Sequence, residues 1–145
     1  MEWMILPYKR YADFNGRSRR MEYWMFTLFS FLMGMFFVAL ILAGLPWDSI
    51  NADGSESTTP PQFSPLFFVG IMLYFVFWLG TIVPALAVLV RRFHDQDKSG
   101  WMLLLYLVPY AGPIIIFVFM CLDGTKGENR FGPDPKDPDR ADIFA

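Results

Sequence analysis

Two clusters of charged and aromatic side chains have the residue types to bind a ligand or carry out chemistry. They cover residues 14–24 and 91–101, and each is rich in arginine. Arginine binds phosphate and carboxylate groups through paired N–H donors. The clusters also contain carboxylates, namely Glu22, Asp95 and Asp97. We therefore expect carboxylate–guanidinium contacts between the two clusters, with surplus donors left for the phosphate of a lipid headgroup.

A simpler interpretation is that the same arginines only fix the orientation of a membrane protein. Basic residues next to a membrane attract anionic lipid with about 1 kcal/mol per charge. The sequence leaves both interpretations open. The candidate lipid- or partner-binding residues flank the apolar stretches of the chain: Arg17, Arg19, Arg20, Arg91, Arg92, His94, Asp95, Lys98, Asn129 and Arg130.

The spacing of His94, Asp95 and Asp97 resembles that of metal-dependent phosphohydrolases. Such sites need several His and carboxylate ligands, and His94 is the only histidine in the chain. A hydrated Mg²⁺ bound by the two aspartates is an alternative, because Mg²⁺ needs few protein ligands. The single cysteine, Cys121, excludes an internal disulfide and a Cys-based zinc site. We expect no metal, no cofactor and no catalytic residue.

Three apolar stretches must position these clusters. Residues 23–45, 66–90 and 101–122 contain no Asp, Glu, Lys, Arg or His, and about 20 apolar residues suffice for a helix that spans a bilayer. The sequence therefore predicts an all-α integral membrane protein, with a membrane domain over residues 23–122. Proton and ion pathways usually have ionisable groups inside the spans. The lack of such groups in these three stretches disfavours a proton or ion pathway.

The third apolar stretch should be broken at its centre. Pro109 and Pro113 each remove a backbone donor and disfavour helix for the preceding residue. A kinked full span would place the C-terminus outside, whereas a re-entrant pair of half-helices would keep it inside. We favour the full span, because a hairpin in lipid needs other protein to shield its backbone.

The distribution of positive charge predicts the orientation. Basic residues occupy the N-terminal segment 1–22 and the loop 91–100, whereas the loop 46–65 has no Lys or Arg. Excess Lys and Arg marks cytoplasmic loops, so we expect a cytoplasmic N-terminus and a flexible outer loop at 46–65. The Gly- and Pro-rich segment 123–145 should leave the membrane without helix and end in a disordered tail. Residues 129–131 could dock on the membrane or on another loop.

Three phrases of the sequence also occur, in this order, in one bacterial family. They are Phe14-x-Gly16-Arg17-x-x-Arg20-x-Glu22-Tyr23-Trp24, Arg91-Arg92-x-His94-Asp95-x-x-Lys98-Ser99-Gly100-Trp101 and Gly124-Thr125-x-Gly127-x-Asn129-Arg130-Phe131-Gly132-Pro133-Asp134-Pro135. Over roughly residues 10–135 the chain resembles the YhaH-type small membrane proteins, domain of unknown function 805. The resemblance implies an inner-membrane protein with several spans, and it implies no activity. Phe93, where an aliphatic residue is expected, and the enlarged outer loop depart from the family.

The sequence thus favours a non-enzymatic component of the bacterial inner membrane. We expect it to bind anionic phospholipid headgroups or a protein partner through its basic cytoplasmic loops, or to form a homo-oligomer, and to bind no nucleic acid. One alternative is a subunit or small oligomeric carrier in membrane transport that uses the broken third stretch. A lipid-headgroup enzyme is the third hypothesis.

Overall fold

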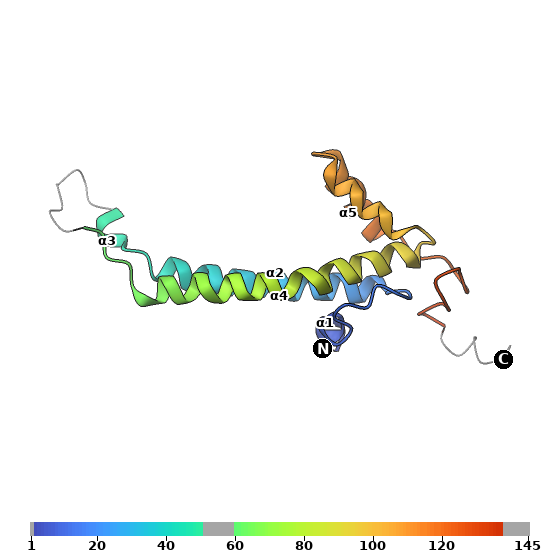
Figure 1. Ribbon diagram of the computed structural model, residues 1–145, viewed down its shortest axis with the longest axis horizontal. Coiled ribbons are helices and arrows are strands. Elements are labelled where there is room, and N and C mark those ends of the chain that lie inside the picture. The colour runs from blue at the N-terminus through green and yellow to red at the C-terminus, as the bar shows by residue number, and fades with distance from the viewer. Residues whose placement is uncertain (1, 51–59, 138–145) are drawn as a thin grey trace. The chain divides into compact units, whose positions relative to one another are not determined.

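The computed structural model describes residues 2–50 and 60–137, and its regular elements in these ranges are helices (Figure 1). In chain order they are α1 (Glu2–Lys9), α2 (Arg20–Ala43), α3 (Trp47–Ile50), α4 (Pro65–Asp95), the 3₁₀ helix η1 (Gly100–Leu107) and α5 (Ala111–Cys121). The predicted all-α class is confirmed. Residues 51–59 of the expected outer loop and 138–145 of the expected tail lie outside the described residues.

Two of these helices, α2 and α4, are long and apolar enough to cross a membrane. Their 24 and 31 residues correspond to about 36 and 46 Å of helix at roughly 1.5 Å per residue, against a hydrocarbon core of about 30 Å. Large apolar side chains on both remain more than half exposed, among them Phe31, Met35, Phe68 and Met72. Such surfaces are typical of helices that are solvated by lipid tails.

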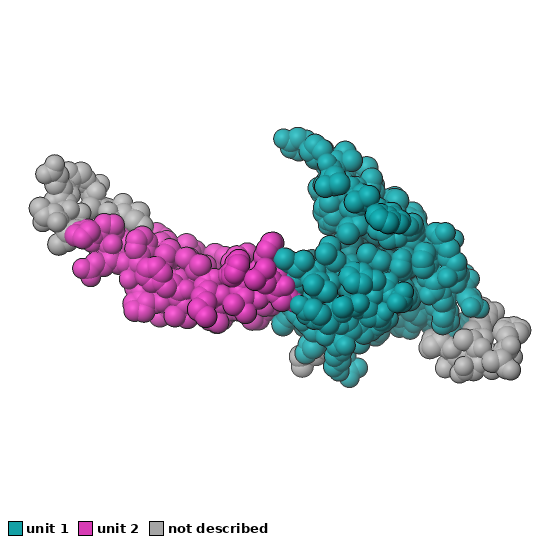
Figure 2. Space-filling model, viewed as in Figure 1, with its two compact units in different colours: residues 1–29, 81–145 teal, residues 30–80 magenta. Residues whose placement is uncertain are grey.

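The chain forms two compact units, drawn in different colours in Figure 2. Unit 2 contains residues 30–80, where α2 and α4 contact each other through Phe37 and Phe77, whose ring centroids are 5.4 Å apart. Unit 1 contains residues 1–29 and 81–145. It therefore holds both basic clusters, the third apolar stretch and the C-terminal segment.

Helix α1 is an element of unit 1 that the sequence did not lead us to expect. It packs through Tyr8, whose ring lies 5.3 Å from that of Phe26 and 6.3 Å from that of Phe29. The Tyr8 hydroxyl is 2.7 Å from Thr81 Oγ1 at the same time. One aromatic residue thus fixes α1 against both α2 and α4.

The third apolar stretch forms a hairpin, so the favoured full span is wrong, whereas the predicted break is confirmed. Helix η1 ends before Pro109, Tyr110 takes a φ of 62°, and α5 then packs back against η1 (Figure 1). A Cβ on Gly112 would lie 1.8 Å from the Leu105 carbonyl oxygen, so only glycine permits this close approach of the two arms. Pro113 falls in the first turn of α5, where its missing donor costs nothing.

Candidate functional site

The two basic clusters meet in unit 1 around the carboxylate of Asp95, the last residue of α4. Arg17 Nε donates to Asp95 Oδ1 over 2.9 Å, and the two side chains are only 1% and 4% exposed. Arg92, one turn earlier in α4, donates to the other carboxylate oxygen of Asp95. A single buried carboxylate therefore binds two guanidinium groups.

A second buried ion pair lies in the same unit. Arg91 Nη2 donates to Glu22 Oε1 over 3.0 Å, with the side chains 0% and 3% exposed. These pairs confirm the predicted carboxylate–guanidinium contacts between the clusters. We call the five side chains the buried charge cluster: Arg17, Glu22, Arg91, Arg92 and Asp95.

The buried charge cluster has three guanidinium groups for two carboxylates, and backbone carbonyls accept hydrogen bonds from the surplus donors. Arg91 also donates to the carbonyl of Asp13, and Arg92 to that of Leu122. The Nε donors of Arg91 and Arg92 have no partner among the described residues, but both atoms are buried. The surplus donors that we expected to reach a lipid phosphate are thus enclosed within the protein.

The C-terminal segment closes over this cluster. Arg17 donates to the carbonyls of Thr125 and Gly127, over 2.5 and 2.6 Å, and the Thr125 amide donates to the Asp95 carbonyl over 2.8 Å. A Cβ on Gly124 would lie 2.0 Å from Asp95 Oδ2, so a larger residue there would displace the carboxylate. The segment therefore depends on a glycine where it crosses Asp95.

Residues 129–131 dock on the segment 91–100, whose residues 91–95 prove to be the end of α4, and not on the membrane. Asn129 Nδ2 donates to the His94 carbonyl over 3.0 Å. The Phe131 ring stacks on the His94 imidazole, with centroids 3.8 Å apart and planes 5° from parallel. Residues from all three motif phrases are thus in contact with one another in unit 1.

The remaining candidate residues lie nearer the surface. Arg20 forms an exposed ion pair of 2.8 Å with Asp123, and Arg130 forms one of 3.0 Å with Asp97. A hydrogen bond from Lys136, together with the nearby Arg20 guanidinium, holds the pKa of Asp123 below its usual value. The other two candidates contact aromatic rings. Arg19 lies over the Trp3 ring at 5.6 Å, and Lys98 lies over the Phe119 ring at 4.9 Å.

The carboxylates considered for Mg²⁺ are both bound to arginine. Asp95 binds Arg17 and Arg92, whereas the exposed Asp97 binds Arg130. Over residues 2–50 and 60–137, no three His, Cys, Asp or Glu side chains come together in a group that could hold a metal ion. The arrangement supports ion pairing in preference to metal binding at these positions.

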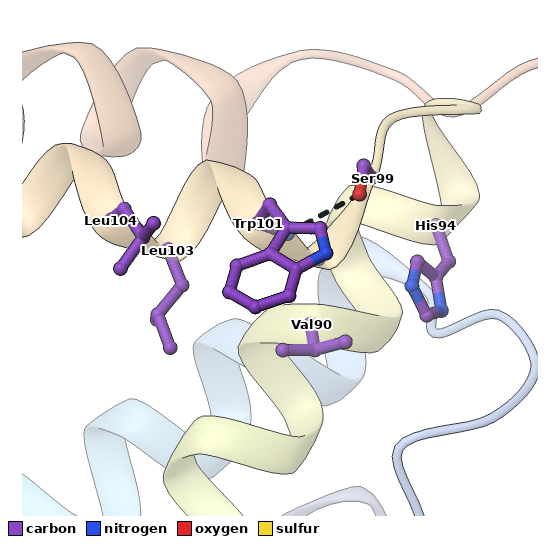
Figure 3. A pocket seen from close by; sticks show the side chains of 7 residues that line it. Val90, His94, Ser99, Trp101, Leu103 and Leu104 are labelled. Atoms are coloured by element: carbon purple, nitrogen blue, oxygen red, sulfur yellow. Dashed lines mark hydrogen bonds between the residues drawn. The ribbon is translucent and has the colours of Figure 1, made fainter.

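A pocket of about 390 Å³ lies between the end of α4 and η1 (Figure 3). We call it the η1 pocket, and its lining residues are Val90, His94, Ser99, Gly100, Trp101, Leu103 and Leu104. Figure 3 shows Leu103 and Leu104 at one end of the group and Ser99 and His94 at the other. His94 is 9% exposed, and its buried Nδ1 has no hydrogen-bond partner among the described residues. The pocket thus has an apolar end and a polar end.

Comparison with known proteins identifies the family. The model of a family described as "Protein of unknown function (DUF805)" matches residues 11–133, which include the first two motif phrases and the third as far as Pro133. The chain belongs to the DUF805 family. Inner membrane protein YhaH of Escherichia coli (strain K12) is 40% identical over 136 residues, 94% of this chain and 98% of the relative.

A further relative is inner membrane protein YhaI of the same strain, 38% identical over 137 residues, which are 94% of this chain and 97% of YhaI. Uncharacterized protein YiiR of that strain is 34% identical over 79 residues, which cover 37% of this chain and 54% of the relative. No solved structure matches the chain. The likeness to YhaH and YhaI, together with two spanning-length helices, makes this DUF805 member a bacterial inner-membrane protein.

Proposed function

We propose that this DUF805 protein is a non-enzymatic component of the inner membrane that binds anionic phospholipid at its cytoplasmic face. The observation that carries the proposal is the distribution of charge between the two units. All 12 Lys and Arg residues belong to unit 1, and residues 30–80 of unit 2 contain none. Such an asymmetry supports a cytoplasmic position for the basic end, where anionic lipids attract Lys and Arg.

The dimensions of the hairpin support its placement in one leaflet. Helix α5 has 11 residues, or about 16 Å, which is close to half of a hydrocarbon core of about 30 Å. The apolar side chains of η1, the other arm of the hairpin, are open to the surroundings, with Trp101 and Leu107 each 78% exposed. A hairpin that enters the inner leaflet and returns would leave both the N-terminus and residues 123–137 in the cytoplasm.

The exposed basic residues, and not the buried charge cluster, are the expected lipid contacts. Arg17, Arg91 and Arg92 are buried and already bound. Lys9 at the end of α1 and Lys126 in the C-terminal segment are exposed. Since each such charge contributes about 1 kcal/mol at the surface of an anionic membrane, replacing both should weaken binding about 30-fold at low salt.

The test compares the retention of phosphatidylglycerol after purification in mild detergent. The Lys9→Gln/Lys126→Gln variant should lose the lipid, and the loss should shrink as salt screens the charges. The Lys9→Arg/Lys126→Arg variant keeps both charges and serves as the matched control, with the retention of the wild type. Equal retention by all three proteins would contradict the proposal. A protein partner that co-purifies in stoichiometric amount, without such lipid, would favour the partner-binding alternative.

A further inference from the structure

We propose that the η1 pocket binds one acyl chain of a phospholipid, with the ester end of the chain at Ser99 and His94. The inference deepens the proposed function, on which it rests, because it places a specific lipid beside the basic surface. The pocket lies on the apolar flank of the hairpin, apart from the exposed lysines proposed to bind the headgroup.

The lining of the η1 pocket changes from polar to apolar along η1. Ser99 precedes the first residue of η1, and His94 lies in the last turn of α4. Leu103 and Leu104 lie one turn further along η1, toward the tip of the hairpin (Figure 3). A phospholipid near its glycerol backbone has the same sequence of groups, since polar esters are followed by an apolar chain. The Ser99 hydroxyl and the His94 imidazole line this polar end, and both groups can donate to ester oxygens.

The surroundings of the pocket favour a lipid over a soluble ligand. Trp101 is 78% exposed and Leu104 is 52% exposed, so the pocket opens on a surface that is itself apolar. In an inner-membrane protein such a surface faces hydrocarbon, and the molecules available there are membrane lipids. Its volume of about 390 Å³ falls within the roughly 300–1,000 Å³ that is usual for small-molecule sites.

Gly100 lies where η1 approaches the end of α4 closely. A Cβ built on Gly100 would lie 2.9 Å from Val90 Cγ1 and 3.5 Å from His94 Nε2. A side chain at this position would displace Val90, which lines the pocket.

The experiment uses the full chain in vesicles of phosphatidylethanolamine and phosphatidylglycerol with a trace of phosphatidylglycerol that carries a photoactivatable diazirine in one acyl chain. After illumination, mass spectrometry maps the adducts. Adducts at residues 90–104 report the pocket. Adducts at Phe31 and Met35, which are more than half exposed on α2, report ordinary lipid contact. In the wild type the pocket adducts should exceed the α2 adducts.

The Leu104→Trp variant fills the apolar end of the pocket, and Leu107→Trp places the same side chain on η1 outside it. Leu104→Trp should lower the ratio of pocket to α2 adducts about tenfold, as expected if about two methylene groups are excluded. Leu107→Trp should leave the ratio unchanged. An equal ratio in the wild type and Leu104→Trp would overturn the acyl-chain site, as would wild-type pocket adducts no more abundant than those on α2.

A second arm of the experiment separates this site from the proposed function. The same diazirine chain is carried on phosphatidylcholine, which has no net charge. Pocket adducts that form equally with both probes, and that are lost in Leu104→Trp, would support the acyl-chain site while contradicting the preference for anionic headgroups. Adducts that depend on Lys9 and Lys126 but not on Leu104 would support headgroup binding and overturn the pocket.

Discussion

Replacing Asp95 by asparagine should release residues 123–132 from the buried charge cluster. The Asn side chain is almost the same size, but it carries no charge for Arg17 and Arg92. Arg17 also binds the carbonyls of Thr125 and Gly127. An unpaired Arg17 will move toward water, and the C-terminal segment will lose these contacts with it.

The size of the effect follows from the burial of the pair. Arg17 is 1% and Asp95 4% exposed, and removing one partner of a buried ion pair costs about 3–5 kcal/mol. Since about 1.4 kcal/mol changes an equilibrium tenfold, the segment should open on the order of a hundred- to a thousand-fold more often. The amides of Thr125, Gly127 and Asn129 are hydrogen-bonded in the closed segment and report its opening.

Hydrogen exchange measured by mass spectrometry in detergent tests this expectation. Asp97→Asn is the matched control, because Asp97 makes an ion pair of 3.0 Å with Arg130 that is about half exposed. Exposed pairs contribute about 0–1 kcal/mol, and Asn tolerates the φ of 55° at this position. Exchange in residues 123–132 should therefore change less than about tenfold in the control. Equal exchange in the wild type and Asp95→Asn would refute the reasoning.

Three further predictions concern the same unit. Glu22→Gln should lower the melting temperature in detergent more than the Glu22→Gln/Arg91→Met double variant does, because only the single change leaves a buried charge unpaired; the opposite order would contradict this. Gly124→Ala should speed exchange in residues 123–132, since its Cβ would meet the Asp95 carboxylate at 2.0 Å; wild-type exchange would show that the close approach is absent. The pKa of Asp123 is lowered by the hydrogen bond from Lys136, so its stabilisation is complete above the ordinary value of 3.8 and is lost as pH falls below it. Asp123→Asn should therefore change stability at pH 6 but not at pH 2, and an equal change at both would contradict the assignment.

The membrane character of the chain and the pairing of its two basic clusters could be predicted from the sequence. Long uninterrupted apolar runs predict membrane helices without further information. The opposite charges of Arg17 and Asp95, in clusters that flank these runs, predicted a contact that the structure contains. The sequence could not indicate that this contact would be buried. Burial depends on residues 123–132, whose glycines and prolines predict only an irregular segment.

The path of the third stretch could not be decided from local propensity. Pro109 and Pro113 predicted the break, but a kink and a reversal have the same sequence signature. The deciding interactions are long-range: Arg92 binds the Leu122 carbonyl, and Arg20 binds Asp123. These contacts fix the end of α5 against the last turn of α4 and the first turn of α2. Helix α1 was missed for a similar reason, because its packing depends on Tyr8 and the distant Thr81.

The hairpin should return the C-terminal segment to the cytoplasmic side of the membrane. Single cysteines placed at Glu128 and at Asp48, both exposed positions, in a Cys121→Ser background can be probed on intact spheroplasts with a membrane-impermeant thiol reagent. We predict that the Asp48→Cys variant is labelled in intact spheroplasts and that the Glu128→Cys variant is labelled only after the spheroplasts are lysed. Labelling of Glu128→Cys in intact spheroplasts would show instead that the third apolar stretch crosses the membrane.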